Sequence, residues 1–169
     1  MADLVTHLCV VLLPGALVRA RGLVLVALGA TLPDLTARVP PIVLESVGQL
    51  VELPELQGWS MLHEPLPQVA LCVALASTFA PEDRRRALVC LLLGVASHIG
   101  LDVLQDHHGW GYALAFPLHW GVYELGWIGS QATVDWAPWL AAATGLAWLV
   151  RLRSSIQGRA PAASEPSRD

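Results

Sequence analysis

The chain has 169 residues, a length that suits one domain, and 54 % of them are hydrophobic while only 14 % are charged. This balance is unusual for a soluble protein, so the composition favours a membrane protein. The three cysteines lie inside apolar runs without CxxC spacing, which argues against a disulfide framework or a thiolate metal site and indicates small core residues.

Five apolar segments follow one another along the chain. Each is predicted to be a helix, because the alternating β-branched pattern of strands is absent. Pro33, Pro65 and Pro138 are expected where helices end or begin. Most segments are shorter than the roughly 20 residues that cross a bilayer, so a compact soluble helical domain stays open. The segments cover residues 4–18, 23–32, 66–80, 87–104 and 136–150.

We therefore predict an all-α fold, an integral membrane bundle of about five helices. Residues 1–152 would form the membrane-embedded domain, and residues 153–169, which are rich in Pro, Ala and Ser, a disordered cytoplasmic tail.

The charges predict an orientation in a cell membrane that the chain crosses several times. If the five segments cross in turn, nine of the ten arginines fall on one side, and ten acidic residues accompany the single Arg38 on the other. The positive-inside rule places the arginine side and the C-terminus in the cytoplasm, with the N-terminus outside. Most tryptophans and tyrosines fall near the outer side, as an interfacial belt in contact with membrane lipid requires. Nucleic acid is not expected as a partner, because that side is acidic and the arginine clusters contain no interleaved aromatic residues.

All six histidines fall on the predicted outer side, several of them in SHIGLDVLQDHH at residues 97–108. His98 and Asp102 are spaced i, i+4, which places both side chains on one face of a helix. Imidazole and carboxylate together bind Zn²⁺, Mn²⁺ or Fe²⁺, although such a pair is also common as a simple hydrogen bond. Four segments contribute the candidate ligands, and the metal site is expected at the extracytoplasmic helix ends: His7, Asp34, His63, His98 and Asp102.

The order of these pieces resembles the YdjM-like membrane-bound metal-dependent hydrolases. The matching pieces are His7, GATLPD ending at Asp34, His63, SHIGLD from 97–102, and GWGYALAFPL up to Pro117. The resemblance covers about residues 3–120. Many members carry H-R-G-x-T-H-S around the third piece, whereas this chain has GWSMLHE and keeps only the final His, so an additional ligand or an anion-binding Arg is missing there.

That family is in turn similar to zinc-dependent phospholipases C and to single-strand-specific zinc nucleases. The resemblance implies that Asp34, His63, His98 and Asp102 surround one ion, with zinc preferred, and that Asp102 bridges towards a second ion held by His7. His108, His119 and Glu124 are weaker candidates for another site.

A site of this kind supports metal-assisted hydrolysis of a phosphoester or a lipid head group. Asp34, if it is not a ligand, could accept the proton of the attacking water, and Asp102 would orient the catalytic ion. Two other classes stay open. One is a haem protein with His7 and His98 as axial ligands. The other is a non-catalytic membrane protein with a structural or decayed metal site, which the missing H-R-G favours.

Overall fold

The computed structural model describes residues 4–17, 22–48, 58–108 and 111–157. Within these ranges the chain is all-α, as predicted, with a single helical turn at residues 58–61 and isolated bridges instead of strands. The longer helices are α1 (Leu4–Leu17), α2 (Leu23–Ser46), α4 (Pro65–Ser77), α5 (Pro81–Leu104) and α6 (Ser130–Gln157).

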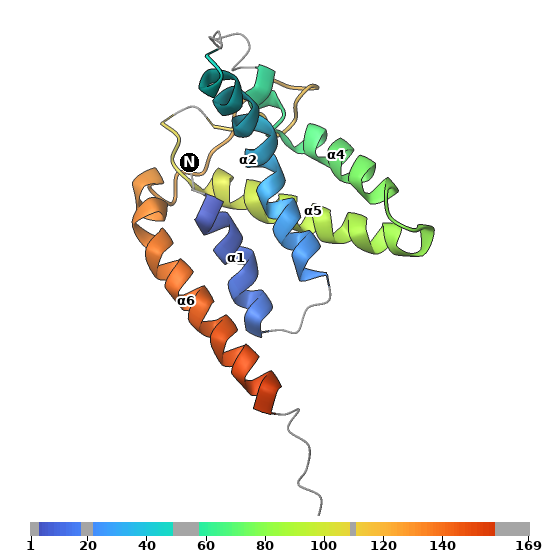
Figure 1. The fold of residues 1–169 in the computed structure, drawn as a ribbon. Coiled ribbons are helices and arrows are strands. Elements are labelled where there is room, and N and C mark those ends of the chain that lie inside the picture. Colours follow the sequence, from blue (N-terminus) through green and yellow to red (C-terminus); the bar gives the residue numbers. More distant parts are fainter. Residues whose placement is uncertain (1–3, 18–21, 49–57, 109–110, 158–169) are drawn as a thin grey trace, which may run out of the picture.

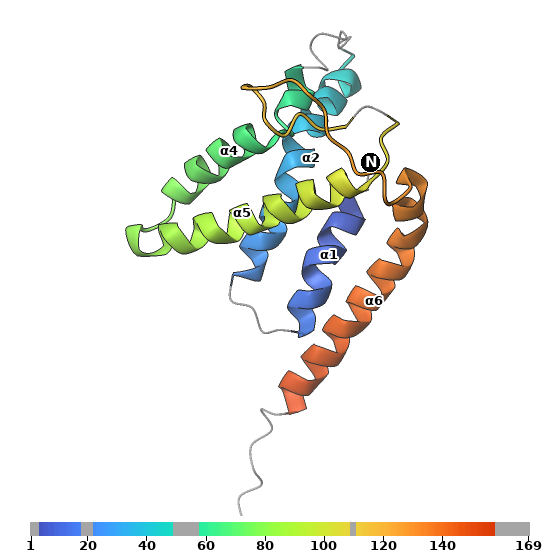
Figure 2. The same ribbon diagram turned by 180° about the vertical axis from the view of Figure 1, so that it is seen from behind.

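The helices pack as two main pairs, α2 on α5 and α1 on α6, with α4 folded back against α5 (Figures 1 and 2). Alpha-helix α5 crosses α2 obliquely, and the crossing is closest at two glycines. A Cβ atom on Gly94 would lie 2.1 Å from the carbonyl oxygen of Val26, and one on Gly29 would lie 2.1 Å from that of Leu91. Because neither residue has a side chain, the two backbones touch, which brings His98, one turn after Gly94, against α2.

The hydrophobic core lies at this crossing and beneath α4. It consists of Leu32, Cys72, Leu91, Val95 and Ile99. All three cysteines are free and buried, which agrees with their prediction as small core residues.

The predicted end of the second helix was wrong. Alpha-helix α2 continues through Pro33 to Ser46, so Asp34 lies within the helix and not beyond it. Pro33 lacks the N–H that would bond the carbonyl of Gly29, but the close packing of Gly29 and Ala30 on α5 outweighs that local loss. The prediction was also wrong for Pro138, which lies inside α6, whereas Pro65 begins α4 as expected.

Among the residues that the structure describes, two helices, α2 and α5, are long and apolar enough to cross a membrane, judged by length and composition. The shorter apolar helices α1 and α4 have 14 and 13 residues, or about 20 Å of helix against a hydrocarbon core of about 30 Å. Two candidate spans are fewer than the five crossings that the charge pattern predicted. Alpha-helix α6 continues to Gln157, five residues into the predicted tail, and the rest of that tail lies outside the described residues.

Candidate metal centre

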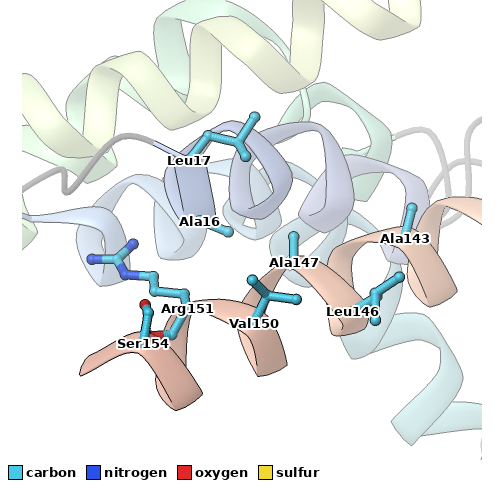
Figure 3. A pocket seen from close by; sticks show the side chains of 8 residues that line it. All are labelled: Ala16, Leu17, Ala143, Leu146, Ala147, Val150, Arg151 and Ser154. Carbon is cyan, nitrogen blue, oxygen red and sulfur yellow. The ribbon is translucent and has the colours of Figure 1, made fainter. Parts of the chain in front are cut away.

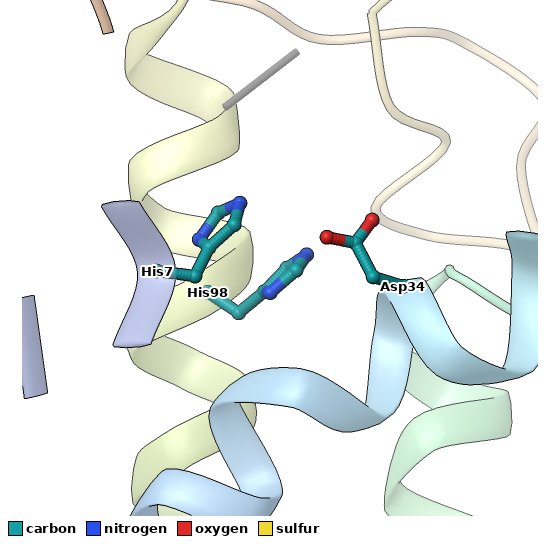
Figure 4. Close-up of side chains that lie close together, drawn as sticks. All are labelled: His7, Asp34 and His98. Atoms are coloured by element: carbon teal, nitrogen blue, oxygen red, sulfur yellow. The ribbon is translucent and has the colours of Figure 1, made fainter. Parts of the chain in front are cut away.

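The five side chains predicted as ligands lie together, and all five residues are buried. They come from α1, α2, α5 and the turn before α4. Figure 4 shows three of them pointing toward one another from three different helices. Donor atoms within 4.8 Å of one another form two groups that share one histidine: His7, Asp34 and His98, and His63, His98 and Asp102.

The second group forms a nearly equilateral triangle of donor atoms. Nε2 of His63 lies 2.9 Å from Nε2 of His98, and Oδ2 of Asp102 lies 3.3 Å and 3.2 Å from these two nitrogens. Donor atoms that bind a tetrahedral zinc ion at about 2.0–2.1 Å are about 3.3–3.4 Å apart. The triangle therefore has the size of one face of a zinc coordination tetrahedron, slightly contracted along the edge between the histidines.

The tautomer of His98 follows from its contact with α2. Nδ1 of His98 lies 2.7 Å from the backbone oxygen of Ala30. A carbonyl oxygen only accepts, so this nitrogen carries the proton and donates it. A neutral His98 then presents the lone pair of Nε2 to the Asp102 carboxylate, which is also an acceptor. Two acceptors this close repel each other unless a metal ion or a further proton lies between them.

Asp102 presents its two oxygens to different histidines. Oδ1 lies 3.3 Å from Nε2 of His7, whereas Oδ2 belongs to the triangle with His63 and His98. The His7 ring stacks on the His98 ring at 3.6 Å between centroids, and neither of its nitrogens has a hydrogen-bond partner. Asp34 completes the centre, since its Oδ1 lies 3.9 Å from Nε2 of His63. The Asp102 carboxylate thus directs one oxygen to His7 and the other to His63 and His98. This is the arrangement of a ligand that bridges two metal ions.

Burial keeps His63 neutral. It lowers the pKa of this imidazole from 6.5 to about 3, although the nearby Asp102 carboxylate acts in the opposite direction. Neutral imidazole is the form that binds metal ions, so His63 is ready to act as a ligand at physiological pH.

Two residues of the centre's surroundings were not predicted. Tyr112 stacks on His63 at 5.0 Å between ring centroids, and its buried hydroxyl lies beside Asp102. Burial, and then the charge of Asp102, raise the pKa of this hydroxyl, so it stays protonated. Glu64 accepts a 3.1 Å hydrogen bond from the backbone N–H of Ala113 and thereby fastens the loop to the residue after His63. The sequence signal that could have identified Glu64 was its position directly after His63.

The weaker candidates do not join this centre. The His108 side chain is 79 % exposed and lies near Asp106. His119 is exposed, and its Nδ1 accepts a hydrogen bond from the backbone N–H of Gly121. Glu124 accepts one from the backbone N–H of His107. The structure therefore does not bring His108, His119 and Glu124 together as a metal site.

The stacked rings also bear on the haem alternative. Two axial ligands direct their nitrogens at the iron from opposite faces of the porphyrin, with the macrocycle between them. The rings of His7 and His98 lie face to face, 13° from parallel and too close for a macrocycle to separate them. This pair does not fit haem.

A groove of about 550 Å³ lies elsewhere, between α1 and the second half of α6 (Figure 3). It shares no residue with the metal centre. Its lining is mainly apolar, with two polar side chains at one end: Ala16, Leu17, Ala143, Leu146, Ala147, Val150, Arg151 and Ser154.

No family model matches the chain, and neither a curated protein nor a solved structure matches it.

Proposed function

We propose that this chain is a membrane-bound hydrolase that uses a divalent metal ion, preferably zinc, at the centre formed by His7, Asp34, His63, His98 and Asp102. The observation that carries the proposal is the buried donor triangle of His63, His98 and Asp102. Three protein donors around one zinc ion are typical of catalytic sites, because a fourth position stays open for water or substrate.

The remaining residues fit a hydrolytic centre. A bound divalent ion lowers the pKa of its water from about 15.7 to near 7. Asp34 lies beside the triangle and could accept the proton of the attacking water. Oδ1 of Asp102 and Nε2 of His7, which lie 3.3 Å apart, supply donors for a second ion. With the resemblance to the YdjM-like hydrolases, this arrangement supports a phosphoester or a lipid head group as the substrate.

The surface supports a membrane as the place of action. Large apolar side chains are exposed on several helices, among them Val24, Leu93 and Leu149. Trp120, Trp127 and Trp139 are also exposed, and tryptophan is the residue that membrane interfaces favour. We infer that the chain contacts lipid on these surfaces, with the metal centre on the extracytoplasmic side and the C-terminus in the cytoplasm.

A structural metal site is the second candidate. The observation that favours it is the burial of all five ligands, since a substrate needs access to the ion. In this alternative the ion joins four segments of the chain and stabilises the fold without turnover.

Metal-dependent turnover separates the two candidates. Protein purified in detergent is stripped with a chelator, reloaded with Zn²⁺ or Mn²⁺, and assayed on a phosphodiester such as bis(4-nitrophenyl) phosphate and on phospholipid in mixed micelles. We expect hydrolysis that disappears on stripping and returns on reloading. A protein that binds the ion and gains thermal stability, but hydrolyses none of these substrates, would be a structural metalloprotein.

A further inference from the structure

Arg38 is a positively charged side chain at the edge of the centre. From residue 22 to residue 83 the sequence contains this arginine and no other, and no lysine. Nε of Arg38 lies 2.8 Å from Oδ1 of Asp34, one turn earlier on α2. Its side chain is 36 % exposed, whereas that of Asp34 is 7 % exposed. Arg38 therefore connects the buried centre with the surface.

The charge of Arg38 acts on His63 and Tyr112, whose rings stack on each other. Burial is the main cause of the lowered pKa of His63, and Arg38 adds to it. Burial and Asp102 raise the pKa of Tyr112, and Arg38 opposes that change. The geometry agrees, since Asp34, which Arg38 contacts, lies 3.9 Å from Nε2 of His63, and the Tyr112 ring stacks on the same imidazole. The guanidinium and the Tyr112 side chain therefore both lie near His63.

We propose that Arg38 and Tyr112 recognise the anionic oxygens of the substrate, so that the centre selects charged phosphoesters over neutral carboxylic esters. This inference rests on the proposed function and adds the residues that determine specificity.

The chemistry of the two side chains supports this role. A guanidinium has five N–H donors in a planar fork that matches the oxygens of a phosphate group. The buried Tyr112 hydroxyl lies beside the Asp102 carboxylate and is held in place by its ring, which stacks on His63 and meets the His107 ring edge to face. A neutral ester would satisfy neither donor as well as a phosphate oxygen does. If the role of Arg38 were limited to its ion pair with Asp34, removing its guanidinium would not weaken the binding of a phosphate ligand.

The test measures binding of inorganic phosphate to the zinc-loaded protein by calorimetry, with zinc content measured in parallel. Arg38→Gln should weaken phosphate binding about 10-fold or more, and Tyr112→Phe about 2- to 10-fold, while zinc content is unchanged. Arg38→Lys keeps the charge without the planar fork of donors, and its affinity for phosphate should lie between those of Arg38→Gln and the parent.

Two controls should bind phosphate as the parent does. Arg85→Gln changes an exposed arginine about 20 Å along α5 from His98, and Tyr123→Phe removes a partly exposed hydroxyl from the neighbouring bridge.

Each outcome decides one question. Zinc-loaded Arg38→Gln that binds phosphate as the parent does overturns the inference and leaves the hydrolase proposal intact. A parent protein that binds no metal overturns the proposed function. Even then, comparing phosphate binding by that metal-free protein and by its Arg38→Gln variant decides the role of Arg38. If Arg38→Gln does not fold, the comparison of Arg38→Lys and Tyr112→Phe with their controls decides it instead.

Discussion

His98 and Asp102 lie one helical turn apart on α5, with Nε2 of His98 3.2 Å from Oδ2 of Asp102. The other nitrogen of His98 bonds the carbonyl of Ala30 on α2. The direction of the imidazole therefore depends on how α5 packs against α2. Because the two backbones touch at Gly29 and Gly94, the geometry of the centre depends on residues that cannot bind a metal themselves.

Gly94→Ala tests this dependence. The new methyl group would meet the carbonyl oxygen of Val26 at 2.1 Å and the backbone nitrogen of Ala30 at 2.5 Å, so the helices must separate. We expect a loss of about 1–3 kcal/mol of stability or more, with weaker metal binding. The control is Gly100→Ala on the same helix, where an added Cβ meets nothing within 4 Å. It should be neutral or stabilise by up to about 1 kcal/mol. Thermal unfolding and metal content of both variants check this, and equal behaviour would contradict the role of the crossing.

Asp102→Asn tests the catalytic role proposed for this carboxylate. The amide keeps the size of the side chain but removes the charge that would balance bound metal ions. We expect the protein to fold and its metal-dependent turnover to fall about 100-fold or more, which is about 2.7 kcal/mol at 1.36 kcal/mol per decade. Asp135→Asn, on the exposed start of α6, is the matched control and should keep parental activity. Metal-dependent turnover that survives Asp102→Asn would refute this assignment.

The buried His63 makes the metal-free protein sensitive to acid. Its pKa is about 3 in the folded chain and 6.5 in the unfolded chain, so between these values only the unfolded state takes up the proton. Stability should therefore fall as the pH drops below 6.5, with a slope from this residue of at most about 1.4 kcal/mol per pH unit. Unfolding of the chelator-treated protein from pH 7 to pH 4 measures this. His63→Gln should flatten the curve, and an unchanged slope would show that His63 is not responsible.

Much of the site could be predicted from the sequence, because the spacing of His98 and Asp102 depends only on helix geometry. His7, Asp34 and His63 followed from their places at the outer ends of apolar segments, and the structure brings them to the same centre. Tyr112 could not be predicted, since it lies in the loop that follows α5. Its position there depends on a backbone bridge to Tyr123. The length of α2 was missed because local proline rules do not include the tertiary packing that holds the helix together across Pro33.

The arginine pattern predicts which side of a membrane holds each end of the chain. A reporter fused at Gly158 should be active only when it reports a cytoplasmic location, because nine of the ten arginines lie on the predicted cytoplasmic side. A second fusion in the 49–57 segment should give the opposite result. Activity of a periplasmic reporter at Gly158 would invert the orientation or remove one crossing.

The metal content of the purified protein tests the central claim most directly. Elemental analysis of protein reloaded with Zn²⁺ and then dialysed should find at least one ion per chain. His98→Ala should weaken binding more than about 100-fold, since loss of a ligand exceeds the 10- to 100-fold effect of second-layer residues. His119→Ala, which removes an exposed histidine outside the centre, should bind zinc as the parent does. A folded parent protein that takes up no zinc, manganese or iron, or a His98→Ala variant that retains the full parental content and affinity, would contradict the account.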